Sequence, residues 1–266
     1  MALYSVDGHL ATLDGGLIRD SGLAGFLYLS YFKGFSANPT VEVPEIGPTV
    51  SWPNPSNAAS TTLTDDLAGT YKGVPAIYTA NSYIYSNDVR DLINARLSAN
   101  KTVSMEVMFF TTTFYDYWAQ WGGLSMGINT SNAYFYIGAN VYTGDRGIGV
   151  GLPWLASSTT EPGYHVCRID GDKCIFVCDD DSLARRKLGL SHLAVIIDKD
   201  ADRTYGYIDG KLCATLNTSN YTLSSLYVAN NLNQAIRLTQ FAIREGNVSF
   251  DNGTRYPYPD APYVAP

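Results

Sequence analysis

Two tight turns within one short stretch, Leu190–Leu216, constrain the fold of this chain more than any other feature of its sequence. From Leu193 to Ile197 apolar residues alternate with smaller ones, which is the pattern of a half-buried strand. The polar run Asp198–Arg203 then predicts a turn. Asp209-Gly210 predicts a two-residue hairpin, because a type I′ turn needs positive φ at both central positions. Three short strands joined by two tight turns imply an antiparallel meander.

The same stretch resembles the laminin-G-like (concanavalin A-like) jelly-roll family. That family typically carries a His-hydrophobic-Ala-Val strand, an Asp turn and a Tyr-Ile/Val-Asp-Gly-Lys hairpin. The matching residues here are His192, Ala194, Val195, Asp198, Tyr207, Ile208, Asp209, Gly210 and Lys211. Strand-like segments at Thr102–Phe110, Leu226–Asn230 and Ile236–Gly246 extend the resemblance, which covers roughly residues 65–250. It implies a fold more than a function, because jelly rolls serve lectins, adhesins, glycanases and structural modules alike.

The expected fold class is therefore all-β: an antiparallel β-sandwich of the jelly-roll type with an irregular N-terminal arm and C-terminal tail. Composition agrees, because aromatic residues make up 13% of the chain, with 20 Tyr, and such side chains suit a pleated surface. One helix is expected at Asn87–Leu97, which opens on an Asn or Asp cap and has apolar residues at helical spacing.

Three parts are predicted along the chain. Residues 1–64 form an N-terminal arm or docking segment, residues 65–250 the sandwich, and residues 251–266 an extended tail rich in Pro and Tyr. The apolar patch Leu23–Phe35 is too aromatic for a free tail, so it either packs against a partner or adds strands to the sandwich. The prolines of Arg255–Pro266 exclude a central position in a sheet.

Charge and hydropathy exclude several partners. A net charge of −7 argues against nucleic acid, since neutralising phosphates needs a basic surface. No run approaches 18 apolar residues and no basic amphipathic helix stands out, so no membrane partner is expected. The first residues lack the basic leader and apolar core of a signal peptide.

Three of the four cysteines lie close together, at Cys167, Cys174 and Cys178. If Asp170-Gly171 forms a type I′ turn, Cys167 and Cys174 lie directly opposite each other, at a separation that allows a disulfide. Free structural thiols are nevertheless the leading reading, ahead of this disulfide. A zinc site with His165 is disfavoured, because Cys178 would lie about 13 Å along the strand from Cys174.

Catalytic patterns are missing from the sequence. Sandwich glycanases of this architecture commonly place carboxylates at alternate positions of one strand, where a retaining pair must stand about 5–5.5 Å apart. Glu106 stands alone in its predicted strand, and Asp179–Asp181 is a consecutive run whose members cannot share a face. His192 matches a family position that is structural. We therefore expect no enzyme, no catalytic residue, no cofactor and no metal.

Two constellations are candidates for binding. An aromatic cluster would stack on sugar rings or fill an interface, with neighbouring polar groups for hydroxyls; its members are Tyr115, Asp116, Tyr117, Trp118, Gln120, Trp121 and Trp154. The series Asp198, Asp200 and Asp202 resembles the start of a calcium loop but lacks the later Gly and Glu of an EF-hand. A solvated hairpin turn is the better interpretation of that series.

The leading functional expectation is a non-enzymatic virion or surface-assembly protein, such as a bacteriophage tail, fibre or capsid-attached module. It would contact other subunits through residues 1–64 and 255–266, take part in host-surface attachment, and form a homo-oligomer, with a trimer favoured by analogy. Its place would be the virion or the cell surface. A carbohydrate-binding lectin or adhesin is the alternative, and a glycan hydrolase with an unusual active site is the third reading.

Overall fold

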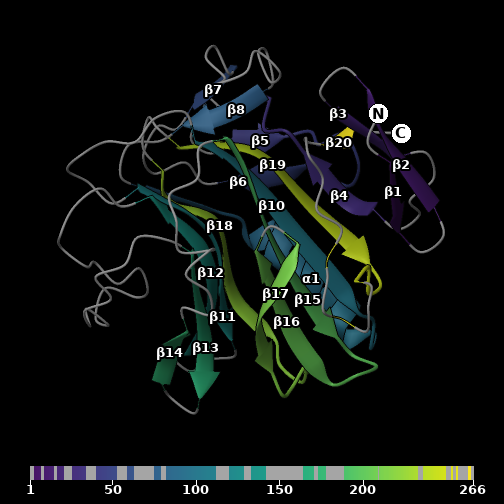
Figure 1. The fold of residues 1–266 in the computed structure, drawn as a ribbon, viewed down its shortest axis with the longest axis vertical. Helices are drawn as coiled ribbons and strands as arrows, with labels where there is room; N and C mark the ends of the chain where they lie inside the picture. Colours follow the sequence, from purple (N-terminus) through teal and green to yellow (C-terminus); the bar gives the residue numbers. More distant parts are fainter. Residues whose placement is uncertain are drawn as a thin grey trace.

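The structure, a computed structural model, describes residues 3–6, 9–14, 17–20, 26–33, 40–52, 59–62, 75–78, 82–111, 120–128, 133–141, 164–170, 173–177, 189–208, 210–232, 236–249, 253, 256 and 263–264. Antiparallel strands dominate these parts of the chain (Figure 1). The expected all-β sandwich is confirmed. Among the described residues, no helix is long and apolar enough to cross a membrane.

Two sheets form the sandwich. The larger has the spatial order β17 (Lys211–Leu216), β16 (Arg203–Ile208), β15 (Gly189–Asp198), β10 (Val103–Thr111), β19 (Ile236–Glu245), β8 (Pro75–Tyr78) and β7 (Ala59–Thr62), and β4 (Phe26–Ser30) also pairs with β19. The other has the order β14 (Lys173–Val177), β13 (Tyr164–Asp170), β12 (Ala133–Val141), β11 (Gln120–Ile128), β18 (Leu223–Leu232) and β9 (Ser82–Tyr85).

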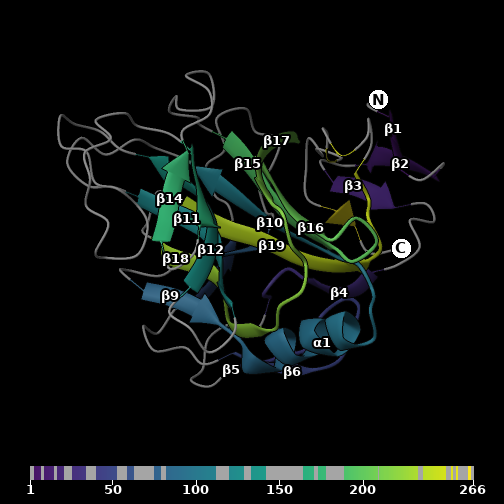
Figure 2. The same ribbon diagram turned by 90° about the horizontal axis from the view of Figure 1, so that it is seen from below.

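Two smaller sheets accompany the sandwich. One joins β1 (Leu3–Val6), β2 (His9–Asp14), β3 (Leu17–Asp20) and β20 (Tyr263–Val264), and the other joins β5 (Thr40–Glu42) and β6 (Val50–Trp52). Strand β20 runs parallel to β3, so both ends of the chain meet in one sheet (Figure 1). Figure 2 shows this sheet to one side of the sandwich, and α1 (Asn87–Ser98) with β5 and β6 along another side.

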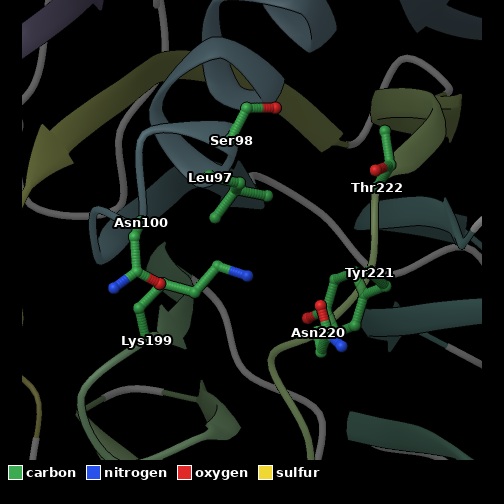
Figure 3. A pocket seen from close by; sticks show the side chains of 7 residues that line it. All are labelled: Leu97, Ser98, Asn100, Lys199, Asn220, Tyr221 and Thr222. Atoms are coloured by element: carbon green, nitrogen blue, oxygen red, sulfur yellow. The ribbon is translucent and has the colours of Figure 1, made fainter.

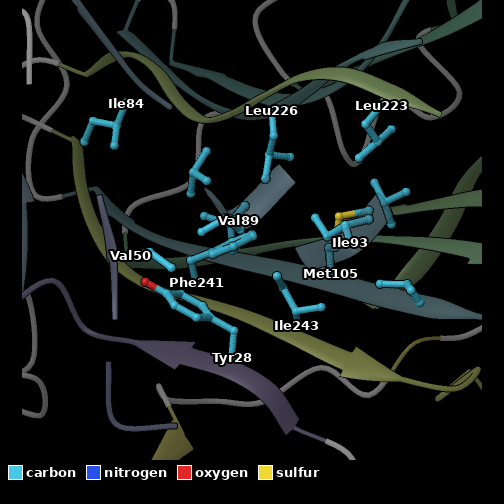
Figure 4. Packing of buried hydrophobic residues seen from close by; sticks show 14 of the residues in the cluster. Tyr28, Val50, Ile84, Val89, Ile93, Met105, Leu223, Leu226, Phe241 and Ile243 are labelled. Carbon is cyan, nitrogen blue, oxygen red and sulfur yellow. The ribbon is translucent and has the colours of Figure 1, made fainter. Parts of the chain in front are cut away.

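Alternation along the strands builds the core between the two large sheets. Val103, Met105 and Val107 of β10 face inward beside the odd-numbered apolar residues of β15, as the sequence predicts. Figure 4 shows residues of the larger sheet facing Ile84, Leu223 and Leu226, with Val89 and Ile93 of α1 nearby. The helix thus belongs to the same apolar cluster as both sheets.

The predicted helix is confirmed, with a different cap. Its N-cap is Ser86, whose hydroxyl accepts a hydrogen bond from Val89 N, rather than Asn87 or Asp88. The other end closes with Asn100 in the left-handed conformation at φ +56°. There, Asn100 N donates to Leu97 O and Lys101 N to Arg96 O, the paired bonds of a Schellman motif.

The predicted meander is confirmed in its register. Asp198 pairs with Arg203 across the first turn, and Ile208 pairs with Lys211 across the second. Two residues therefore connect β16 to β17, and Gly210 has the positive φ of +78° expected in such a hairpin. Asp209 lies outside the described residues.

Part of the N-terminal segment lies within the sandwich. Strand β4 pairs with β19 in antiparallel register, and Tyr28 joins the main core. The sequence leaves two predictions for this segment: packing against a partner, or additional strands of the sandwich. The observed pairing of β4 agrees with the second. The division of the chain at residues 64 and 250 stays a prediction.

The expected position of two cysteines is corrected by the register of β13 and β14. Cys167 pairs with Phe176, and Cys174 pairs with Ile169, so the two cysteines are not directly opposite. The cause is the position of the turn. The prediction put residues 170–171 in the turn, whereas Asp170 pairs with Lys173, so that residues 171–172 connect the two strands. A difference of one residue at the turn moves the facing partner by two. Cys178 lies outside the described residues.

Candidate functional site

Most of the aromatic cluster predicted as a binding site lies outside the described residues. Tyr115, Asp116, Tyr117, Trp118 and Trp154 lie outside the described residues. Gln120 and Trp121 lie in strand β11, opposite Val141 and Asn140 of β12, and only their backbone is described. Their role in binding stays a prediction.

Glu106 lies in a buried polar network on the face of the larger sheet that points away from the core. Its carboxylate accepts a hydrogen bond from Arg244 Nε at 2.9 Å and lies 2.8 Å from His192 Nε2. The ring of Tyr256 covers His192, with the ring centroids 5.3 Å apart. All four side chains are buried, so this network is closed to a ligand from solvent.

The Asp-x-Asp-x-Asp series forms a turn, as expected, although its first member is buried. Asp198 Oδ1 accepts hydrogen bonds from the backbone N–H groups of Asp200 and Ala201, and Oδ2 accepts one from Asn247. Asp202 makes its hydrogen bonds outside the turn: its Oδ1 accepts from both N and Oγ of Ser219. Within the described part of the chain, no group of three metal-ligating side chains is positioned to hold an ion.

An open hollow of about 490 Å³ lies where the end of α1 meets the β15–β16 turn and the β17–β18 loop (Figure 3). It is lined by Leu97, Ser98, Asn100, Lys199, Asn220, Tyr221 and Thr222. Most of these side chains carry amide or hydroxyl groups. In Figure 3 the ammonium group of Lys199 points into the hollow.

Each wall of the hollow is held by local structure. The Schellman motif fixes Asn100 just beyond α1. On the opposite side, Asn94 of α1 binds the backbone of Leu223 twice, as donor to its carbonyl and acceptor from its amide, each at 2.9 Å. These bonds fix the start of β18 against the helix, immediately after the loop residues that line the hollow.

The floor of the hollow is nearly closed to solvent. Tyr221 is buried, and its hydroxyl lies 2.5 Å from Thr204 Oγ1, which donates to Thr218 O. Burial raises the pKa of the Tyr221 phenol above its ordinary value of 10.0, and the bond with Thr204 lowers it by less. The phenol is therefore neutral near pH 7 and acts as a fixed support.

The chemistry of the lining suits a hydroxyl-rich ligand. Side-chain amides such as those of Asn100 and Asn220 offer both donors and acceptors, which match sugar hydroxyls that also do both. Lys199 supplies the positive charge among the lining residues, and its Nζ donates to Ser219 O at 2.8 Å. The arrangement can bind and orient a polar molecule.

Sequence reasoning missed this hollow. Its two asparagines come from segments far apart in the chain, and polar residues after a helix or in a loop have a plain structural explanation. The one local signal is that Asn220 precedes Tyr221-Thr222 at the edge of a strand pattern, which is too common to mark a site.

Comparison with known proteins gives only a distant likeness. No protein-family model matches the chain, and no curated protein does. Among solved structures, a Trypanosoma rangeli sialidase is similar with 12% identity and a TM-score of 0.49, over 91% of this chain and 34% of the sialidase. The chain thus spans about a third of that enzyme.

Two further structures are similar at the same level. The carbohydrate-binding domain CBM40 of the Ruminococcus gnavus IT-sialidase has 14% identity and a TM-score of 0.39, over 67% of this chain and 94% of that domain. A carbohydrate esterase of the Shiga toxin-encoding bacteriophage phi24B has 11% identity and a TM-score of 0.44, over 74% of this chain and 90% of the esterase. At these identities the likeness concerns the fold.

The prediction that the chain is not an enzyme is contradicted by the comparisons, since sialidases and a carbohydrate esterase stand among the similar structures. This likeness concerns the fold and assigns no activity to this chain. The prediction rested on the absence of local catalytic motifs, chiefly of carboxylates spaced along a single strand. Catalytic groups that come together from separate strands escape such a rule, since a fold does not determine which residues carry the chemistry.

Proposed function

We propose that this chain is a glycan-binding β-sandwich domain and that its ligand occupies the hollow beside the end of α1. The single observation that carries this proposal is the lining of the hollow, where amides and hydroxyls from Ser98, Asn100 and the β17–β18 loop converge on one open space. The proposal includes a laminin-G-like identity for the sandwich, on the motif of His192, Ala194 and Val195.

Other ligand classes fit the hollow less well. An apolar ligand would leave the amides and hydroxyls without hydrogen bonds, at a cost of about 1–3 kcal/mol for each group buried in that way. Nucleic acid is disfavoured by the net charge of −7. A sugar ring satisfies polar groups on several sides at once, and Leu97 offers it one small apolar contact.

The test is a glycan array on the full chain, followed by calorimetry with the strongest neutral and acidic hits. Asn220→Ala and Asn100→Gly each remove one amide, and Gly keeps the positive φ that Asn100 adopts. Each variant should weaken binding about fivefold to tenfold, the equivalent of one hydrogen bond. Asn217→Ala is the matched control, because Asn217 is exposed in the same loop and does not line the hollow.

Two results would count against the proposal. If no glycan binds at millimolar concentration, the proposal that the chain binds glycans is rejected. Binding that survives both Asn220→Ala and Asn100→Gly would place the ligand elsewhere, with the predicted aromatic cluster around Trp118 and Trp121 as the next site to mutate.

A second candidate function is attachment to other subunits in a virion or surface assembly. Its support is the small sheet in which β3 and β20 pair, because this pairing joins the two predicted contact segments, 1–64 and 255–266. Deletion of residues 1–20, assayed by light scattering against the full chain, tests it. A homo-oligomer, with a trimer favoured, should become monomeric, and an unchanged mass would contradict this candidate.

A further inference from the structure

Lys199 and Asp202 hold one residue of the β17–β18 loop from two sides. Lys199 Nζ donates to Ser219 O at 2.8 Å, and Asp202 Oδ1 accepts from Ser219 N at 2.9 Å and from Ser219 Oγ at 3.0 Å. Ser219 is itself only 2% exposed, so these bonds are made at the base of the loop. Ser219 directly precedes Asn220 and Tyr221, which line the hollow.

The loop depends on such side-chain bonds for its shape. It runs from Asn217 to Thr222, between the end of β17 and the start of β18, so no strand pairing fixes it. Its backbone bond from Tyr221 N to Ser219 O closes only a local bend. Binding is tighter when a loop is already ordered, because less conformational entropy is lost with the ligand.

Asp202 has a positive backbone φ. Its φ of +47° lies in the left-handed region, which Asp adopts more readily than most residues other than Gly and Asn. The bond from the Ser219 backbone N–H lowers the pKa of the Asp202 carboxyl, and the Ser219 hydroxyl and Lys199 add to that effect. The contacts therefore favour the charged carboxylate, which is the form that only accepts hydrogen bonds.

We infer that Asp202 is a positioning residue of the hollow: it fixes the Asn217–Thr222 loop and thereby the wall that Asn220 provides. This inference rests on the proposed function for its effect on binding, whereas its effect on the loop does not depend on any ligand. The three aspartates of the turn then have separate roles, because Asp198 organises the turn itself and Asp200 is an exposed residue between them.

The experiment compares Asp202→Gly, Asp202→Asn and the control Asp200→Asn by amide hydrogen exchange and by affinity for the strongest array glycan. Gly adopts φ +47° without strain, so Asp202→Gly keeps the turn and removes only the carboxylate. Exchange at Ser219 and Asn220 should become at least about tenfold faster, and affinity should fall about tenfold. Asp202→Asn should show a smaller rise in exchange and a smaller loss of affinity than Asp202→Gly, since the amide oxygen of Asn can still accept from Ser219 N. Asp200→Asn should change neither.

The outcomes separate this inference from the proposed function. Unchanged exchange in Asp202→Gly overturns the inference, whether or not any glycan binds. Faster exchange with unchanged affinity also overturns it, because the loop would then not serve the hollow. If the natural sequence binds no glycan, the proposed function fails, and faster exchange confined to the Asp202 variants still supports a loop held by Asp202.

Discussion

The carboxylate of Glu106 and the guanidinium of Arg244 form a hydrogen-bonded ion pair of 2.9 Å in which both side chains are almost inaccessible to solvent. The aromatic ring of Phe26 lies against the guanidinium, with its centroid 4.2 Å from Cζ. Strands β10 and β19 are adjacent and antiparallel, so this pair joins neighbouring strands on the outer face of the larger sheet.

Removing Glu106 should be strongly destabilising. Glu106→Ala leaves the buried charge of Arg244 without this carboxylate, which typically costs about 3–5 kcal/mol. The control is Glu45→Ala at the exposed Lys33–Glu45 pair, where about 0–1 kcal/mol is expected. Urea unfolding measures both, and Glu106→Gln replaces Glu106→Ala if the latter does not fold. Equal small losses in the free energy of unfolding would show that the buried pair is not important for stability.

Two glycines with the same backbone angle allow a second comparison. Gly47 and Gly246 both have φ +105°, where any other residue is strained by about 1–3 kcal/mol. A Cβ at Gly47 would lie 2.5 Å from Leu27 O, whereas nothing lies within 4 Å of a Cβ at Gly246. Gly47→Ala should therefore lower the free energy of unfolding clearly more than Gly246→Ala. Similar decreases in the free energy of unfolding for the two variants would mean that the backbone near Leu27 shifts at little energetic cost.

Local patterns explain which parts of the fold were predictable. Alternation in Val103–Val107 and Leu193–Ile197 identified core-facing residues correctly, because a strand has a strict period of two. In β19 the period fails, since the register shifts opposite Met108 and Phe109, so that Leu238 and Phe241, three residues apart, both face the core. Such a bulge depends on the neighbouring strand and leaves no clear mark in the sequence.

The candidate site was less predictable than the fold. The turn at Asp198–Arg203 follows from its residues, yet the burial of Asp198 depends on Asn247, from a distant part of the chain. The hollow likewise requires α1 to lie beside β18, a contact made by Asn94 and Leu223, 129 residues apart. No local pattern contains that separation, so sequence reasoning turned to the aromatic cluster instead.

Acid should release the bond between Asp202 and Ser219. The pKa of the Asp202 carboxyl is lowered from its ordinary value of 3.8, so its stabilising contribution is complete above that value and is lost as pH falls through the lower folded value. The Ser219 amide resonance should therefore shift with a midpoint below pH 3.8. In Asp202→Asn that transition should be absent. A midpoint above 3.8 would contradict the contact.

Alkali should destabilise the protein through its buried tyrosines. Burial raises the pKa values of Tyr28, Tyr207 and Tyr221 above 10.0, so the folded protein keeps protons that the unfolded chain loses. The free energy of unfolding should then fall as pH rises above 10, by up to about 1.4 kcal/mol per pH unit for each such group.

Tyr221→Phe tests this for the tyrosine under the hollow. At pH 8 the variant should be less stable by about 0.5–1.5 kcal/mol, because the hydrogen bond with Thr204 is lost. Above pH 10 the difference should shrink, since only the natural sequence has to keep the Tyr221 phenol protonated in the fold. Urea unfolding at pH 8, 10 and 11 measures the two curves. Parallel curves would mean that Tyr221 ionises as readily in the folded protein as in the unfolded chain, which its burial argues against.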